Sequence, residues 1–102
     1  MEVERAIQRK IDEALREAME RLPRVLPEAL RIVRMEGGPY EDKDGDPSYK
    51  IQVVYSEDTT YKEIGSAPVH EIKEVVRSRL IEHGLEEFPY FFFSRENEVE
   101  AV

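Results

Sequence analysis

Three carboxylates at alternate positions are the most metal-like feature of this sequence. In Asp42-Lys43-Asp44-Gly45-Asp46 they have the spacing of the first half of an EF-hand calcium loop. An EF-hand also requires glycine at its sixth position and a bidentate glutamate at its twelfth, where this chain has Pro47 and Val53. We therefore interpret the segment as a solvated turn and predict no metal site in it.

A second metal-like pattern is His70-Glu71-Ile72-Lys73-Glu74, which resembles the zinc-protease pattern H-E-x-x-H except at its last position. Zinc needs a second imidazole one helical turn away, and the pattern offers Glu74 there. The other histidine, His83, follows along the same expected helix at a distance of about 20 Å. The two histidines cannot share an ion within one chain, and the sequence predicts no metal and no cofactor.

Nucleophilic and acid–base catalysis have no identifiable residues in this sequence. Cysteine is absent, and Ser66 lies in Gly-Ser-Ala, outside the G-x-S-x-G pattern, where it would serve as a helix cap. The 18 glutamates make chance pairs unavoidable, so no acid–base couple can be singled out. An enzyme with an unrecognised site remains an alternative.

A locally basic stretch near the end of the first helix could contact phosphate. Its candidate residues for nucleic-acid contact are Arg21, Arg24, Arg31 and Arg34. The expected order of elements is also that of type II KH domains, but their G-x-x-G clamp is missing. The net charge of −8 disfavours nucleic acid, so a KH-like module is the alternative and not the first hypothesis.

The most informative stretch is Phe88-Pro89-Tyr90-Phe91-Phe92-Phe93. In a strand, alternate rings point to opposite faces, and helices on one side of a sheet cover only one of those faces. The uncovered rings would lie on an open face or edge, where large exposed apolar groups mark contact surfaces. We predict an interface that includes Tyr90, Phe91, Phe92 and Phe93.

Two helices are expected to position these residues. Val3, Ile7, Ile11, Leu15 and Leu22 form one stripe of a helix over residues 2–22, which Pro23 should end. A second helix begins at Ser66 or Ala67, buries Val69, Ile72, Val76 and Leu80, and runs to His83. Gly84 suits its left-handed C-terminal position, and Leu85 the hydrophobic contact that follows.

Three strands are expected between and after the helices. Residues 29–35 fit a helix or a strand, and the Ile32-Val33 pair before Gly37-Gly38-Pro39 favours a strand. Residues 36–48 predict a polar loop, and residues 49–55 alternate as the clearest strand. Residues 88–93 predict a last strand, with Pro89 suited to the start of an edge strand.

The predicted fold is α+β in the order α-β-β-α-β. The simplest assembly is a three-stranded sheet of order 2-1-3 with both helices packed on one face. Residues 1–94 form a single domain, and residues 95–102 an acidic tail. At 102 residues the chain is the usual size of one domain.

The composition indicates a soluble protein. The longest apolar run is far shorter than the ~20 residues of a membrane span, and the charged N-terminus is unlike a secretion signal. Both features favour the cytoplasm. The absence of cysteine, few amide residues and 37% charged residues are typical of thermophile proteins.

Two segments together carry a family resemblance. They are Asp44-Gly45-Asp46-Pro47-Ser48 with the strand that follows, and residues 79–84 leading into Phe88-Pro89-Tyr90-Phe91. Over its last two-thirds the chain resembles small prokaryotic proteins of undetermined function in gene pairs similar to toxin–antitoxin pairs. The resemblance implies a binding role beside a small protein partner.

These observations favour a non-catalytic protein-interaction domain. Its expected partner is a second copy of itself, a small antitoxin-like protein, or both. The aromatic last strand predicts a homodimer, because an edge strand with exposed rings is readily covered by a symmetric copy. Serine at whichever of the four interface rings is exposed should then yield a folded monomer.

Overall fold

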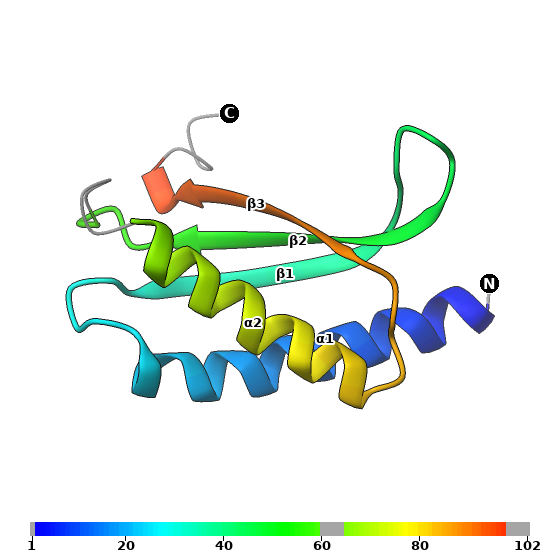
Figure 1. Cartoon of the computed structure of the whole chain (residues 1–102), viewed down its shortest axis with the longest axis horizontal. Helices are drawn as coiled ribbons and strands as arrows, with labels where there is room; N and C mark the ends of the chain where they lie inside the picture. Colours follow the sequence, from blue (N-terminus) through cyan, green and yellow to red (C-terminus); the bar gives the residue numbers. More distant parts are fainter. Residues whose placement is uncertain (1, 60–64, 98–102) are drawn as a thin grey trace.

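The computed structural model describes residues 2–59 and 65–97, and these residues form two helices and one sheet (Figure 1). In chain order the elements are α1 (Glu2–Val25), β1 (Ile32–Glu41), β2 (Pro47–Tyr55), α2 (Ser66–Glu82) and β3 (Pro89–Arg95). The predicted α-β-β-α-β order is therefore confirmed. Among the described residues, no helix is both long enough and apolar enough to cross a membrane.

The strand order is β1-β2-β3, so the predicted order 2-1-3 is wrong. β2 lies in the centre, antiparallel to β1 and parallel to β3. One physical reason is that α1 packs against β1 and reaches its backbone at Gly37. There the Gln8 side chain of α1 donates from Nε2 to the Gly37 carbonyl over 2.7 Å. β3 instead follows the α2 crossover and pairs with the other edge of β2.

β1 lies further along the chain than the predicted residues 29–35. The expected loop over residues 36–48 is mostly strand, because Gly37-Gly38-Pro39 continue β1 opposite residues 49–51. Pro39 is tolerated because β1 is an edge strand and needs partners on one side only. The turn itself occupies residues 42–46, where Gly45 adopts a φ of +85°.

α1 extends past the predicted end at Leu22 to Val25, with Pro23 inside its last turn. A proline near a helix C-terminus removes a single backbone hydrogen bond, and Leu26 N–H still reaches the Leu22 carbonyl at 3.0 Å. The predicted stripe is otherwise buried from Ile11 to Leu22, although Val3 is exposed.

One hydrophobic core joins both helices to one face of the sheet. Ile51 and Val53 point into it from β2, and Phe91 and Phe93 pack against it from β3. α1 contributes a stripe of small and large residues, which are Ile11, Ala14, Leu15, Ala18 and Leu22. Figure 1 shows both helices running alongside the strands.

The C-terminal end of α2 is confirmed in detail. Gly84 has a φ of +82°, and the N–H groups of Gly84 and Leu85 donate to the carbonyls of Ile81 and Leu80. Leu85 is then buried in the core, as this cap requires. At the N-terminal end Ser66 is the first helical residue, one of the two predicted starts, but the cap position is held by Gly65 and not by Ser66.

β3 begins at Pro89, as expected of an edge strand, but continues to Arg95. The predicted tail over residues 95–102 therefore starts within the strand, and a helical turn at Glu96 and Asn97 follows it. The rest of that tail, residues 98–102, lies outside the described residues.

The first prediction concerns the contact of α1 with β1 at Gly37. A methyl group there would lie 2.9 Å from Ile51 Cδ1, 3.0 Å from the Lys50 carbonyl oxygen and 3.1 Å from Ile11 Cγ2. Gly37→Ala should lower the free energy of unfolding by about 1–3 kcal/mol, because the core must shift to admit the methyl. Urea unfolding measures this change.

Gly38→Ala is the matched control for that substitution. Its methyl would approach only the flexible end of the Gln8 side chain, at 3.0 Å. Gly38→Ala should lower the free energy of unfolding clearly less than Gly37→Ala does. Equal effects of the two substitutions would contradict a packing constraint at Gly37.

The second prediction concerns two core tyrosines. Burial raises the pKa of Tyr55 to about 12. Burial, followed by the hydrogen bond to the Glu87 carboxylate, raises the pKa of Tyr49 to about 12 from 10.0. Between pH 10 and about 12 the folded chain therefore keeps the two phenolic protons, whereas the unfolded chain loses them. The contribution of these two hydroxyl groups to the free energy of unfolding is complete below pH 10 and is lost as the pH rises through about 12.

Tyr55→Phe separates this effect from packing. The Tyr55 hydroxyl is buried without a hydrogen-bond partner among the described residues. Its removal should raise stability at neutral pH by about 1 kcal/mol and weaken the alkaline loss. Urea midpoints at neutral and alkaline pH test both effects, and a destabilised Tyr55→Phe protein would show that the hydroxyl has a partner.

Candidate interaction surface

β3 is an edge strand whose side chains alternate between the core and the opposite face of the sheet. Phe91 and Phe93 pack against the core, whereas Tyr90 and Phe92 leave 39% and 40% of their surface exposed. The four predicted interface residues are therefore divided between two faces. Phe88 lies just before the strand and is more exposed still.

We call the face of the sheet opposite the helices the open face. It is the face that carries Glu36, Lys50, Gln52, Tyr90 and Phe92, which alternate with the core residues of the three strands. Neither α1 nor α2 packs on this side. The exposed rings of β3 therefore lie where the sequence analysis expected an uncovered surface.

A third ring completes an aromatic cluster on the open face. Tyr40 of β1 lies edge-on to Tyr90, with 5.7 Å between ring centroids, and edge-on to Phe92 at 6.5 Å. The cluster of Tyr40, Tyr90 and Phe92 thus reaches from one edge strand towards the other across β2. The sequence analysis missed Tyr40 because it placed this residue in a loop.

A shallow hollow of about 290 Å³ lies beside this aromatic cluster. Gly38, which pairs with Lys50, brings no side chain to this part of β1. Glu36, Pro39, Lys50 and Gln52 also line it. The open face therefore carries both a projecting group of rings and a hollow, and its charged residues are of both signs.

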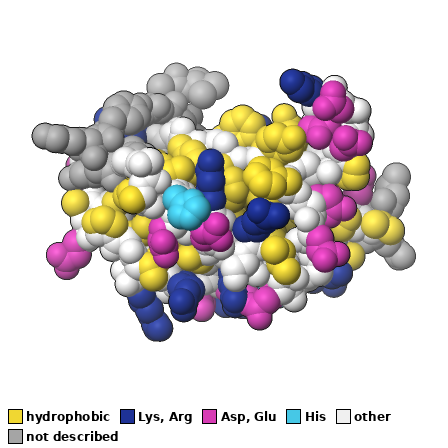
Figure 2. Space-filling view, viewed as in Figure 1, with side chains coloured by type: hydrophobic (Ala, Val, Ile, Leu, Met, Phe, Trp, Pro, Cys, Tyr) yellow, Lys and Arg dark blue, Asp and Glu magenta, His cyan; other side chains and the backbone are white. Residues whose placement is uncertain are grey.

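A second hollow, of about 340 Å³, lies between α2 and β3, and we call it the α2–β3 groove. It is lined by His70, Lys73, Glu74, Arg77, Phe88, Pro89, Tyr90 and Phe91. Lys73 Nζ lies 5.9 Å from the centre of the Phe91 ring, and the Arg77 guanidinium carbon 5.1 Å from that of Phe88. Figure 2 shows this side of the molecule, with basic side chains beside a group of hydrophobic ones.

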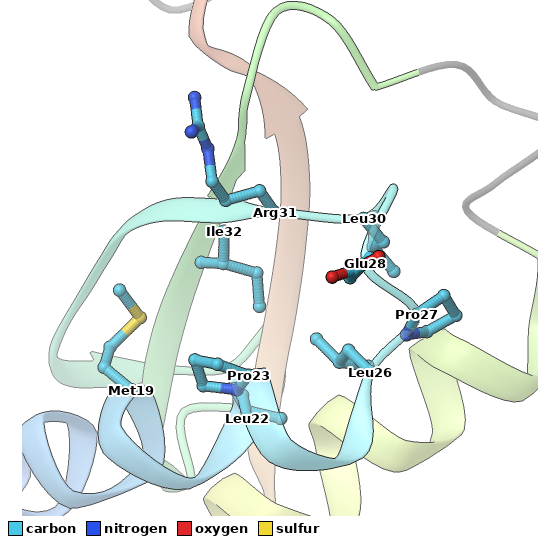
Figure 3. A pocket seen from close by; sticks show the side chains of 9 residues that line it. All are labelled: Met19, Leu22, Pro23, Leu26, Pro27, Glu28, Leu30, Arg31 and Ile32. Atoms are coloured by element: carbon cyan, nitrogen blue, oxygen red, sulfur yellow. The ribbon is translucent and has the colours of Figure 1, made fainter.

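The third hollow is an apolar cavity of about 250 Å³ where α1 passes into β1 (Figure 3). Met19, Pro23, Leu26 and Ile32 converge on it, while the Arg31 guanidinium points away from it. The cavity arises because two prolines hold the chain away from the sheet. Its lining is mostly apolar, with Glu28 and Arg31 as the charged residues, so it offers few polar groups to orient a ligand.

The four arginines considered for nucleic acid do not gather on one element. Arg21 and Arg24 are exposed on α1, and Arg31 is exposed in the connection to β1. Arg34 belongs to β1, where its Nε lies 2.8 Å from a Glu36 carboxylate oxygen. This ion pair leaves Arg34 less available to phosphate.

The two histidines have separate carboxylate neighbours. His70 is exposed on α2, with its Nε2 3.7 Å from Glu74. His83 at the end of α2 lies 3.1 Å from Glu17 of α1, a carboxylate that Arg79 also approaches at 3.8 Å. His83 therefore contributes to helix packing, a contact that its position in the sequence does not indicate.

The three aspartates of the β1–β2 turn do come together. Ligand atoms of Asp42, Asp44 and Asp46 all lie within 4.8 Å of one another. Asp42 Oδ1, however, already accepts hydrogen bonds from the backbone N–H groups of Asp44 and Asp46, each at 2.9 Å. This arrangement accounts for the cluster as part of the turn.

Comparisons with known proteins give no relative for this chain. No protein-family model, no curated protein and no solved structure matches it.

The third prediction concerns calcium at this turn. The aspartates have no bidentate glutamate to complete a coordination sphere, so calcium should bind no tighter than about millimolar. Isothermal titration calorimetry measures the affinity, with Asp44→Asn as the control. Micromolar binding that Asp44→Asn abolishes would contradict the prediction.

Proposed function

We propose that this chain is a non-catalytic protein-interaction domain that self-associates through the open face of its sheet. The observation that carries the proposal is the pairing, on one face, of a projecting aromatic cluster with a hollow. A two-fold dimer brings the same face of both copies together, so that each cluster meets the hollow of the other copy. A projection and a hollow on the same face are what such symmetry requires.

The energetics of the cluster support the proposal. Tyr40, Tyr90 and Phe92 each keep more than a third of their surface exposed. Covering apolar surface contributes about 25 cal/mol per Å², so burying these rings would stabilise a complex by several kcal/mol. Rings exposed together on a rigid strand also lose little conformational freedom on binding.

The charges of the open face are compatible with a second copy. Lys50 Nζ lies 5.1 Å from the centre of the Phe92 ring, and Glu36 lies on the neighbouring strand. A two-fold axis between them would allow Lys50 of each copy to approach Glu36 of the other. Like charges therefore need not meet at this interface.

Two other roles have less support. A KH-like nucleic-acid function would need a continuous basic patch, and the arginines proposed for it lie on three separate segments. An enzymatic function would need a pocket with convergent polar groups. A small antitoxin-like partner could bind the same open face in place of a second copy.

The fourth prediction is that the chain is a dimer and that Tyr40→Ser with Phe92→Ser makes it a monomer. Tyr90 is left unchanged because it also lines the α2–β3 groove. Multi-angle light scattering at about 100 µM should give twice the chain mass before substitution and the chain mass after it. Circular dichroism should be the same for both proteins.

The control for this experiment is Ile81→Ser, because Ile81 is 48% exposed on α2, away from the open face. It should leave the dimer intact. A wild-type monomer at this concentration would overturn self-association and leave a heterologous protein as the partner. Dissociation by Ile81→Ser would move the interface to the helices.

A further inference from the structure

The α2–β3 groove has the features of a site for an extended chain. No described strand pairs with the outer edge of β3, and an unpaired strand edge is a template for a further strand. The groove runs beside this edge and is bounded by α2 on one side. Strand addition at such an edge uses backbone hydrogen bonds for affinity and neighbouring side chains for selectivity.

The charges in the groove indicate the chemistry of that chain. Lys73 and Arg77 lie over aromatic rings, and neither has a carboxylate within 4.0 Å among the described residues. Other basic residues of the same chain, such as Arg16 and Arg34, do form ion pairs with glutamates. In a chain with 23 acidic residues, two cations without carboxylate partners in one hollow form a local basic site.

We propose that the α2–β3 groove binds an extended acidic segment of another protein, which adds to the edge of β3 and places its carboxylates against Lys73 and Arg77. The inference rests on the proposed protein-interaction role, but it concerns a second surface, which shares Tyr90 with the aromatic cluster of the open face. Apolar side chains alternating with the acids would point to the opposite face of the sheet, which is the open face. The partner is thus defined as an acidic strand with alternating apolar residues.

A second copy of this chain is a poor occupant of this groove. Antiparallel pairing of two β3 edges about a two-fold axis perpendicular to the sheet would bring Lys73 and Arg77 of one copy towards the same cations of the other, and like charges disfavour such pairing. The net charge of −8 does not prevent an acidic segment from binding in the groove. At physiological ionic strength, charges more than about 8 Å away are largely screened, so the nearby cations dominate.

The fifth prediction tests this site with a synthetic octapeptide that alternates glutamate and valine, is blocked at both ends, and carries a fluorescent label. Fluorescence anisotropy should show saturable binding to the wild-type protein that weakens as salt is raised. Lys73→Glu with Arg77→Glu should weaken binding by about tenfold or more, because two attractive contacts become repulsive. A peptide with lysine in place of glutamate should bind far more weakly.

The matched control reverses two exposed charges elsewhere, with Arg9→Glu and Lys10→Glu on α1. It changes the net charge by the same amount and should leave peptide binding within about twofold. Absence of saturable binding, equal binding of the lysine peptide, or an equal loss in the control would each overturn the proposal. Circular dichroism confirms that each variant is folded.

The two proposals can fail separately. Tyr40→Ser with Phe92→Ser changes the open face and replaces no residue that lines the groove, so this protein should still bind the peptide. A monomeric wild-type protein that binds the acidic peptide would refute self-association alone. A dimeric wild-type protein that does not bind the peptide would refute only the proposal for the α2–β3 groove.

Discussion

The close approach of α1 to the sheet at Gly37 is the constraint on which the rest of the structure depends. At this point Ile11 of α1, the backbone of β1 and Ile51 of β2 meet with no room for a methyl group. Because α1 lies so close to β1, the Gln8 side chain can also donate a hydrogen bond to the Gly37 carbonyl. The helices thereby cover one face of the sheet, and β3 lies at the edge opposite β1 with the open face beside it.

The exposure of the aromatic residues follows from this arrangement. β3 has aromatic residues at consecutive positions, and a strand directs consecutive side chains to opposite faces. The helices provide a core for Phe91 and Phe93 only, so Tyr90 and Phe92 must lie on the open face. No rearrangement within the sheet could bury both sets, since a shift of register by one residue would merely exchange them.

The helices could be predicted from sequence because their signals are local. The apolar stripe of α1 and the Gly84-Leu85 cap of α2 depend on residues close in sequence, and both were found. The strand order and the extent of β1 depend on contacts between distant residues. From their local sequence, Gly37 and Gly38 predict a turn. In the fold they belong to β1, and the missing side chain at Gly37 allows α1 to approach the strand. The alternation of rings on β3 was predictable, but Tyr40 could join the cluster only once its segment was known to be a strand.

An edge strand with aromatic rings on both faces tends to pair with other chains and aggregate. The cations around β3 reduce this tendency. Lys50 lies over Phe92 on the open face, while Lys73 and Arg77 lie over Phe91 and Phe88 beside the edge. Each cation shields apolar surface, and together they place positive charge on both sides of the free edge. A strand that approaches this edge must bring negative charge or meet repulsion. Under the proposal for the α2–β3 groove, the residues that disfavour uncontrolled pairing of β3 would also select the kind of chain that pairs with it, so protection and recognition would have one physical cause.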